Sequence, residues 1–171
     1  MMRPPVALAF LAMFTIAAGE TAGAFMGWLR PAVESYAGSR VTANALAHGL
    51  AGSAEYDAEV TRRAVFGAEA GLSFFHTHAE GVGLIVLLVG GVAATFVVSR
   101  PLRGGLYALL ALASLFPWGY VVYAVAVLEL GRDAGIGLAE RWVLMPLGSA
   151  AILALLGVAA ALLSGRRAAA R

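Results

Sequence analysis

Four long apolar blocks, separated by shorter polar segments, dominate the pattern of hydrophobic and polar positions along the chain. A helix of roughly 20 residues crosses a hydrocarbon core about 30 Å thick, and each block reaches that length. The pattern therefore predicts an all-α, polytopic membrane protein: a four-transmembrane-helix bundle that forms a single membrane domain over residues 1–171. The predicted spans are residues 5–29, 72–99, 104–128 and 142–163.

The connection between the first two spans, residues 30–71, is too long for a simple turn. Its proline-free stretches at 44–50 and 54–66 mix polar and apolar positions, which predicts two short helices. Breaks rich in small residues and glycine are expected at 37–39 and 49–53. We therefore expect a partly helical connection on the outer side of the membrane.

Arginine residues flank one side of the predicted bundle, and no acidic residue accompanies them there. The positive-inside rule assigns such a side to the cytoplasm. Both termini are therefore expected to be cytoplasmic, and the acid-bearing connections at 30–71 and 129–141 to lie outside. The arginines are Arg3, Arg100, Arg103, Arg166, Arg167 and Arg171.

The first apolar block also has features of a cleavable signal peptide. Arg3 precedes an apolar run over residues 6–18, and small residues follow at Gly19 and Ala22. Cleavage there would leave three spans. The apolar stretch continues to Leu29, and this length favours a membrane-spanning helix.

The composition restricts the chemistry further. Hydrophobic residues make up 61% of the chain and charged residues 13%, against about half and about a quarter in soluble domains. The absence of cysteine excludes disulfides, thiolate nucleophiles, iron–sulfur clusters and covalently attached haem. The basic residues are all arginine, which excludes a lysine Schiff base. A net charge of +2 provides no basic stripe for nucleic acid.

Ionisable residues within the predicted spans are few, and each is costly to place in a bilayer, so each is a candidate for function. Those nearest the outer ends of the first three spans are expected to converge on one side of the bundle. They are Glu20, His76, His78, Glu80 and Glu129. His48 and Glu69 of the outer connection are expected to fold over this group as a lid.

Helical geometry separates the two histidines of the second span. Successive residues turn by about 100°, so His76 and Glu80 share a face whereas His78 points the opposite way. A neutral imidazole can ligate a b-type haem, and imidazole with carboxylates suits a copper, iron, zinc or manganese ion. The alternative is that these groups form only interhelical hydrogen bonds and bind no cofactor. The candidate metal ligands are His76, His78, Glu80, Glu20, Glu129 and His48.

The third span contains an aromatic run with Pro117 and Gly119 near its centre. These two residues are expected to kink the helix and to free backbone carbonyl groups. Tyr120 and Tyr123 then lie on one side of the outer half, where they would form a pocket wall for a quinone-like or haem-like ring. The alternative is an ordinary aromatic belt at the membrane interface.

The run Phe75-His76-Thr77-His78, followed by glycine and a long aliphatic stretch, resembles a family of small bacterial four-helix membrane proteins. That family is in turn similar to part of the catalytic subunit of the haem–copper oxidases and nitric oxide reductases. There, a span begins with a similar His-Thr pair whose histidine ligates a b haem. The resemblance covers about residues 72–91 and a glycine-rich first span.

The resemblance implies a bacterial inner membrane protein in which His76 is a haem ligand, whereas His78 has no assured counterpart. The chain lacks the later histidines that complete an oxidase centre, so a complete oxygen- or nitric-oxide-reducing site is not expected. A second axial ligand would come from His48, His78, Met26, a twin subunit or a partner protein.

Three functions are compatible with these features. The first is a redox subunit that binds a b-type haem or a metal through His76 and exchanges electrons with quinone or a membrane protein partner. The second is a non-catalytic accessory or assembly subunit of a larger membrane complex. The third is a small proton-coupled transporter that uses Glu20 and Glu129.

Overall fold

The computed structural model describes residues 3–169, with side chains through residue 164. Helices make up 90% of the structure, and the described residues form no strand. Four helices are long and apolar enough to cross a membrane, which confirms the all-α, multi-pass prediction at this level. They are Val6–Trp28, Ala54–Phe96, Arg100–Leu130 and Arg132–Ser164.

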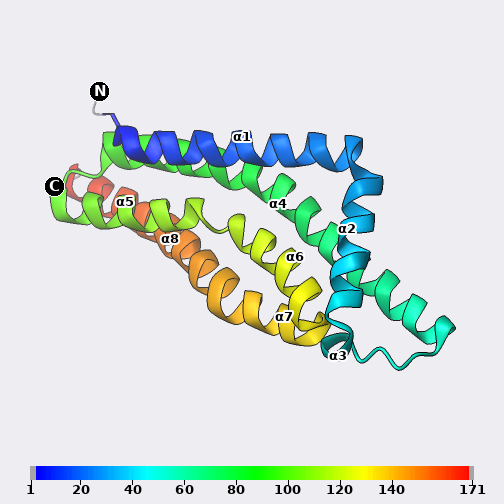
Figure 1. The fold of residues 1–171 in the computed structure, drawn as a ribbon. Coiled ribbons are helices and arrows are strands. Elements are labelled where there is room, and N and C mark those ends of the chain that lie inside the picture. The colour runs from blue at the N-terminus through cyan, green and yellow to red at the C-terminus, as the bar shows by residue number, and fades with distance from the viewer. Residues whose placement is uncertain (1–2, 170–171) are drawn as a thin grey trace.

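The long helices run side by side in two pairs (Figure 1). The N-terminus, the connection between α4 and α5, and the C-terminus lie at the same end of the bundle. Arg3, Arg100 and Arg103 therefore gather at one end, and its cytoplasmic orientation stays a prediction. The pairs are α1 (Val6–Trp28) with α4 (Ala54–Phe96), and α5 (Arg100–Ser114) with α8 (Met145–Ala169).

Small residues allow α1 and α4 to approach each other closely. A Cβ atom on Gly83 would lie 2.4 Å from Ile16 Cγ1 and 3.1 Å from the Ala12 carbonyl oxygen. A Cβ atom on Gly19 would lie 2.4 Å from Ala79 Cβ. Larger residues at these glycines would push the two helices apart, which is the usual reason for small residues at membrane helix contacts.

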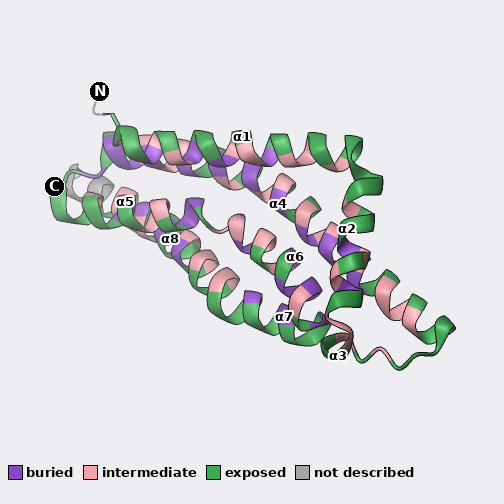
Figure 2. Cartoon of the chain, in the orientation of Figure 1, coloured by how far each residue is buried: buried purple, intermediate pink, exposed green. Residues whose placement is uncertain are grey.

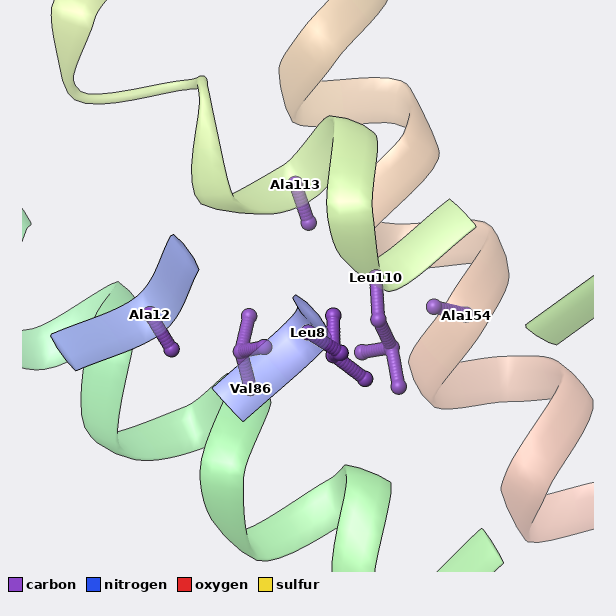
Figure 3. Packing of buried hydrophobic residues seen from close by; sticks show 6 residues of the cluster. All are labelled: Leu8, Ala12, Val86, Leu110, Ala113 and Ala154. Carbon is purple, nitrogen blue, oxygen red and sulfur yellow. The ribbon is translucent and has the colours of Figure 1, made fainter. Parts of the chain in front are cut away.

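An apolar core joins the four helical segments (Figure 3). Leucine and valine side chains from different helices meet there, while alanines keep the backbones close. Lipid tails are as apolar as these side chains, so dispersion packing stabilises this core more than exclusion of water does. Its buried members are Leu8, Ala12, Val86, Leu110, Ala113 and Ala154.

Buried residues follow the sides on which the helices face each other, and the outward sides are exposed (Figure 2). Many of the exposed side chains are large and apolar, including Leu84, Leu88 and Leu156. A soluble protein rarely exposes so much apolar surface, whereas lipid tails cover it without cost. The distribution therefore supports contact with a lipid bilayer.

The third span is broken at its centre. Residues 115–117 form a turn between α5 and α6 (Trp118–Leu130). The Trp118 amide donates to the carbonyl three residues before it, so the Ser114 carbonyl has no partner within the helix. The hydroxyl of Thr15 on α1 donates to the Ser114 oxygen at 3.3 Å and accepts a hydrogen bond from Trp118 Nε1 at 3.3 Å. Thr15 thus compensates for the break from a neighbouring helix, as buried backbone in a membrane requires.

The helix α2 (Arg30–Ala43) runs without interruption through residues 37–39, so the break expected there is wrong. Ala37 and Val41 are buried against α4 and α6, and this packing stabilises the helix across its small residues. The local sequence signal for a turn is therefore overridden by tertiary contacts.

The break at residues 49–53 is confirmed. It follows α3 (Ala45–His48), and Gly49 and Gly52 have positive φ angles of 66° and 80°, which favour glycine. The helix expected at 54–66 also forms, but it continues without a break into the second span as the single long helix α4.

The fourth span begins earlier than expected, because residues 132–141, which were expected to be a connection, are helical. α7 (Arg132–Ala139) leads through the π-helical segment η1 (Glu140–Leu144) into α8. The Met145 amide donates to the carbonyl of Glu140, five residues back. Pro146 follows directly and has no N–H to continue the ladder, which accounts for an irregular turn at this place.

Candidate metal site

The structure brings Glu20, His76 and Glu80 together, with Glu20 in the second half of α1 and the other two near the middle of α4. One ligand atom of each residue lies within 4.8 Å of the ligand atoms of the other two. His76 and Glu80 are one helical turn apart, and their side chains approach to 3.3 Å between Nδ1 and Oε1. Glu20 comes from the facing helix. Three of the expected ligands therefore share one location.

Close packing of α1 on α4 produces this arrangement. A Cβ atom on Gly23 would lie 2.7 Å from both Cε1 and Nδ1 of His76, so only glycine leaves space for the imidazole there. Gly19, one turn away, provides the contact with Ala79 that brings the two backbones together. The glycine spacing in the first span thus positions Glu20 beside His76.

The hydrogen bonds of His76 define its protonation pattern. Nδ1 lies 3.0 Å from the carbonyl oxygen of Gly19, and a carbonyl oxygen only accepts. Nδ1 therefore carries a proton and donates to Gly19, with the Glu80 carboxylate as a second neighbour. In the neutral imidazole this leaves a lone pair on Nε2. About 30% of the His76 side chain and 40% of the Glu80 side chain are exposed.

This donor set can bind a metal in two ways. Nε2 of His76 can be the ligand, with Gly19 and Glu80 orienting the ring from the Nδ1 side, as outer-shell partners of metal-bound histidine commonly do. Alternatively, the ring adopts the other neutral tautomer, with the proton on Nε2, and Nδ1 binds an ion together with Glu20 and Glu80. Imidazole with carboxylates suits zinc, iron, copper or manganese, and three protein ligands leave coordination positions open.

A groove of about 420 Å³ lies between α1, α2 and α4, about one helical turn from the imidazole in the direction of α2. Met26 of α1 lines it, three residues after Gly23. Ser73 of α4 also lines it, three residues before His76. Arg30 and Glu69 also line it and approach each other to 3.9 Å. The groove therefore lies next to the His76 region, and none of the three candidate ligands lines it.

His78 lies on the other face of α4, as the helical geometry predicted. Its Nδ1 donates to the Phe74 carbonyl at 2.9 Å, and its ring is 4.7 Å from the ring of Tyr120 and 5.7 Å from that of Phe116. His78 therefore belongs to an aromatic cluster and does not meet His76.

Tyr120 and Tyr123 have different environments. Tyr120 contacts His78 and lines a groove beside α8. Tyr123 packs on Gly71 instead, and a Cβ atom on Gly71 would lie 2.8 Å from Tyr123 Cδ1. The two tyrosines therefore do not form a common wall next to His76.

Glu129 forms a separate cluster with Arg40 and Asn44. It accepts hydrogen bonds from Arg40 at 2.6 and 2.7 Å and from Asn44 at 3.1 Å. This hydrogen-bonded carboxylate raises the pKa of Arg40 above its ordinary value. Arg132, which is closer to Glu129 in the sequence, pairs with Asp133 instead. Arg40 was missed because nothing in the local pattern showed that α2 folds back onto α6.

The expected lid residues also make other contacts. His48 Nε2 donates to the Leu128 carbonyl at 3.0 Å, which ties α3 to α6 beside Glu129. Glu69 lies near Arg30, and both residues line the groove between α1, α2 and α4. The two residues therefore make their contacts at separate places in the fold.

Comparison with known proteins adds no relative: no protein-family model, curated protein or solved structure matches the chain. We therefore infer the function from the residues of the site itself.

Proposed function

We propose that the chain is a small integral membrane redox subunit that binds one metal ion through Glu20, His76 and Glu80 near its outer face. Electron exchange with a quinone or a protein partner is part of this proposal. The observation that carries it is the convergence of three ligand atoms from two helices within 4.8 Å of one another.

The charge of the group supports a cation there. Among the described residues, no arginine forms an ion pair with Glu20 or Glu80, whereas Glu34, Glu59 and Glu129 each pair with at least one. Two carboxylates beside a single imidazole are costly in the outer half of an apolar bundle. A divalent or trivalent metal ion balances that charge and uses the same oxygen and nitrogen atoms as ligands.

A b-type haem is the second candidate, favoured by one specific observation. The Nδ1–H group of His76 donates to Gly19, which leaves Nε2 as the nitrogen available to an axial ligand position. His78 faces away from His76 and His48 contacts Leu128, so neither supplies the second axial ligand. That ligand would come from Met26, a twin subunit or a partner protein, or the iron would remain five-coordinate.

An absorption spectrum combined with metal analysis on gently solubilised protein tests both candidates. The three-ligand site is supported if the protein shows no Soret band and contains a bound ion, and if this ion is lost in both Glu20→Gln and His76→Ala. A Soret band lost in His76→Ala but kept in Glu20→Gln supports haem. Glu129→Gln is the matched control, since its carboxylate pairs with Arg40. Colourless, metal-free wild-type protein that also fails to take up added metal or haem contradicts the proposal.

A further inference from the structure

A second groove, of about 450 Å³, lies between α6 and the helix formed by η1 and α8, on a different side of the bundle from His76. The regular helix is interrupted on both sides of it, by the turn at 115–117 and by the π-helical segment. Such irregular segments often occur at functional sites in helical proteins. The volume is within the range of small-ligand pockets.

Aromatic rings form one wall of this groove. Phe116 and Tyr120 both line it, and their rings meet edge to face at 5.6 Å. His78 lies against both rings, at 5.7 and 4.7 Å, and thereby fixes their orientation. Gly148 allows α8 to approach, since a Cβ atom there would lie 3.2 Å from Phe116 Cε2. The aromatic wall is therefore held in place by packing.

A single charged residue, Glu140, lines the groove. It makes no ion pair with any residue whose side chain the structure describes. The neighbouring Arg141 lies over the Trp142 ring at 5.5 Å instead. By contrast, Asp133 on the preceding turns pairs with Arg132. The groove thus carries an uncompensated negative charge next to aromatic rings, and the rest of its lining is uncharged.

We propose that this groove binds an amphipathic organic cation from the outer side of the membrane. The positive group would lie between the Glu140 carboxylate and the rings of Phe116 and Tyr120, where charge attraction and cation–π contact act together. The apolar part of the ligand would lie along Leu144 and Ile152, which also line the groove. The proposal does not depend on a metal at His76.

Equilibrium binding of tetraphenylphosphonium to the purified full chain tests this site, with neutral triphenylphosphine oxide as the comparison ligand. Wild-type protein should bind the cation saturably at one site per chain and bind the neutral compound at least about tenfold more weakly. Glu140→Gln should weaken cation binding about tenfold or more. Asp133→Asn, an exposed acid at the same end of the fold, should leave binding unchanged.

Three results would overturn the assignment: no saturable binding of the cation, equal binding of the neutral compound, or unchanged affinity in Glu140→Gln. Because Glu140 is exposed, its replacement is not expected to impair folding. His76→Ala should retain cation binding, so failure of the metal site and failure of this site give different results.

Discussion

The imidazole of His76 and the backbone of Gly19 join α4 to α1, with His76 Nδ1 donating to the Gly19 carbonyl oxygen at 3.0 Å. This bond sets the ring orientation and leaves Nε2 uncommitted. It exists only because the glycines of α1 admit the second helix so closely. The packing of the bundle and the chemistry proposed for it therefore depend on the same residues.

Substitution of Gly23 should separate packing from metal binding. A Cβ atom in Gly23→Ala would lie 2.7 Å from the His76 ring, so the ring must move away from Gly19 and Glu20. Overpacking of this kind costs about 1–3 kcal/mol of stability. We expect bound metal per chain to fall below about half of the wild-type content in a protein that is still folded.

Gly27→Ala is the matched control for this experiment, because no atom lies within 4 Å of the added methyl group. It should keep both the metal content and the thermal unfolding midpoint of the wild type. Equal metal content in Gly23→Ala and Gly27→Ala would show that the position of the imidazole is unimportant.

Thr15→Val should destabilise the bundle without affecting the metal. The hydroxyl group satisfies the Ser114 carbonyl at the break in the third span and accepts from Trp118. Its loss leaves a fully buried carbonyl unpaired, and interhelical hydrogen bonds in membranes contribute about 0.6–1.7 kcal/mol. Reversible unfolding in mixed micelles measures the difference.

Thr95→Val serves as the comparison, since its exposed hydroxyl bonds only to the Gly91 carbonyl of its own helix. If the two variants unfold at the same denaturant concentration, Thr15 does not stabilise the break.

Arg40→Gln should loosen the outer part of the fold. The guanidinium group joins α2 to α6 through two hydrogen bonds to Glu129. Hydrogen–deuterium exchange should increase across α2 and α3, and the protection of α1 should stay unchanged. Because both side chains are about one-third exposed, added salt should weaken the same contact in the wild type. Unaltered exchange in α2 would contradict this role.

The orientation of the chain can be tested with single cysteines, because the native sequence has none. Ser35 is an exposed residue of α2, so Ser35→Cys should react with a membrane-impermeant maleimide that is added outside intact cells. Ser99→Cys, exposed at the opposite end, should react only after the cells are permeabilised. The reverse pattern would invert the predicted topology.

The sequence predicted the long helices well, because an apolar block of membrane length has few alternatives. It also predicted the break near Pro117 and the separation of His76 from His78, since both follow from local geometry. Breaks within the connection were predicted less accurately. The break at 37–39 does not occur, because buried contacts of Ala37 and Val41 stabilise α2 there.

The partners of the polar groups were harder to predict than the groups themselves. Glu20, His76 and Glu80 meet because glycines allow α1 and α4 to pack closely. The contact of Glu129 with Arg40 depends on how α2 folds back over α6, and no local pattern encodes that path. No local signal marks Glu140 as a site residue, because the π-helical segment and the groove beside it arise only from tertiary packing.

The most direct test of the central claim is the metal content of the purified wild-type chain after exposure to iron, copper, zinc and manganese and removal of loosely bound ions. The proposed site predicts close to one tightly bound ion per chain, lost in Glu20→Gln and retained in Glu129→Gln. Equal metal content in wild-type protein and Glu20→Gln, or none in either, would contradict a metal site formed by Glu20, His76 and Glu80.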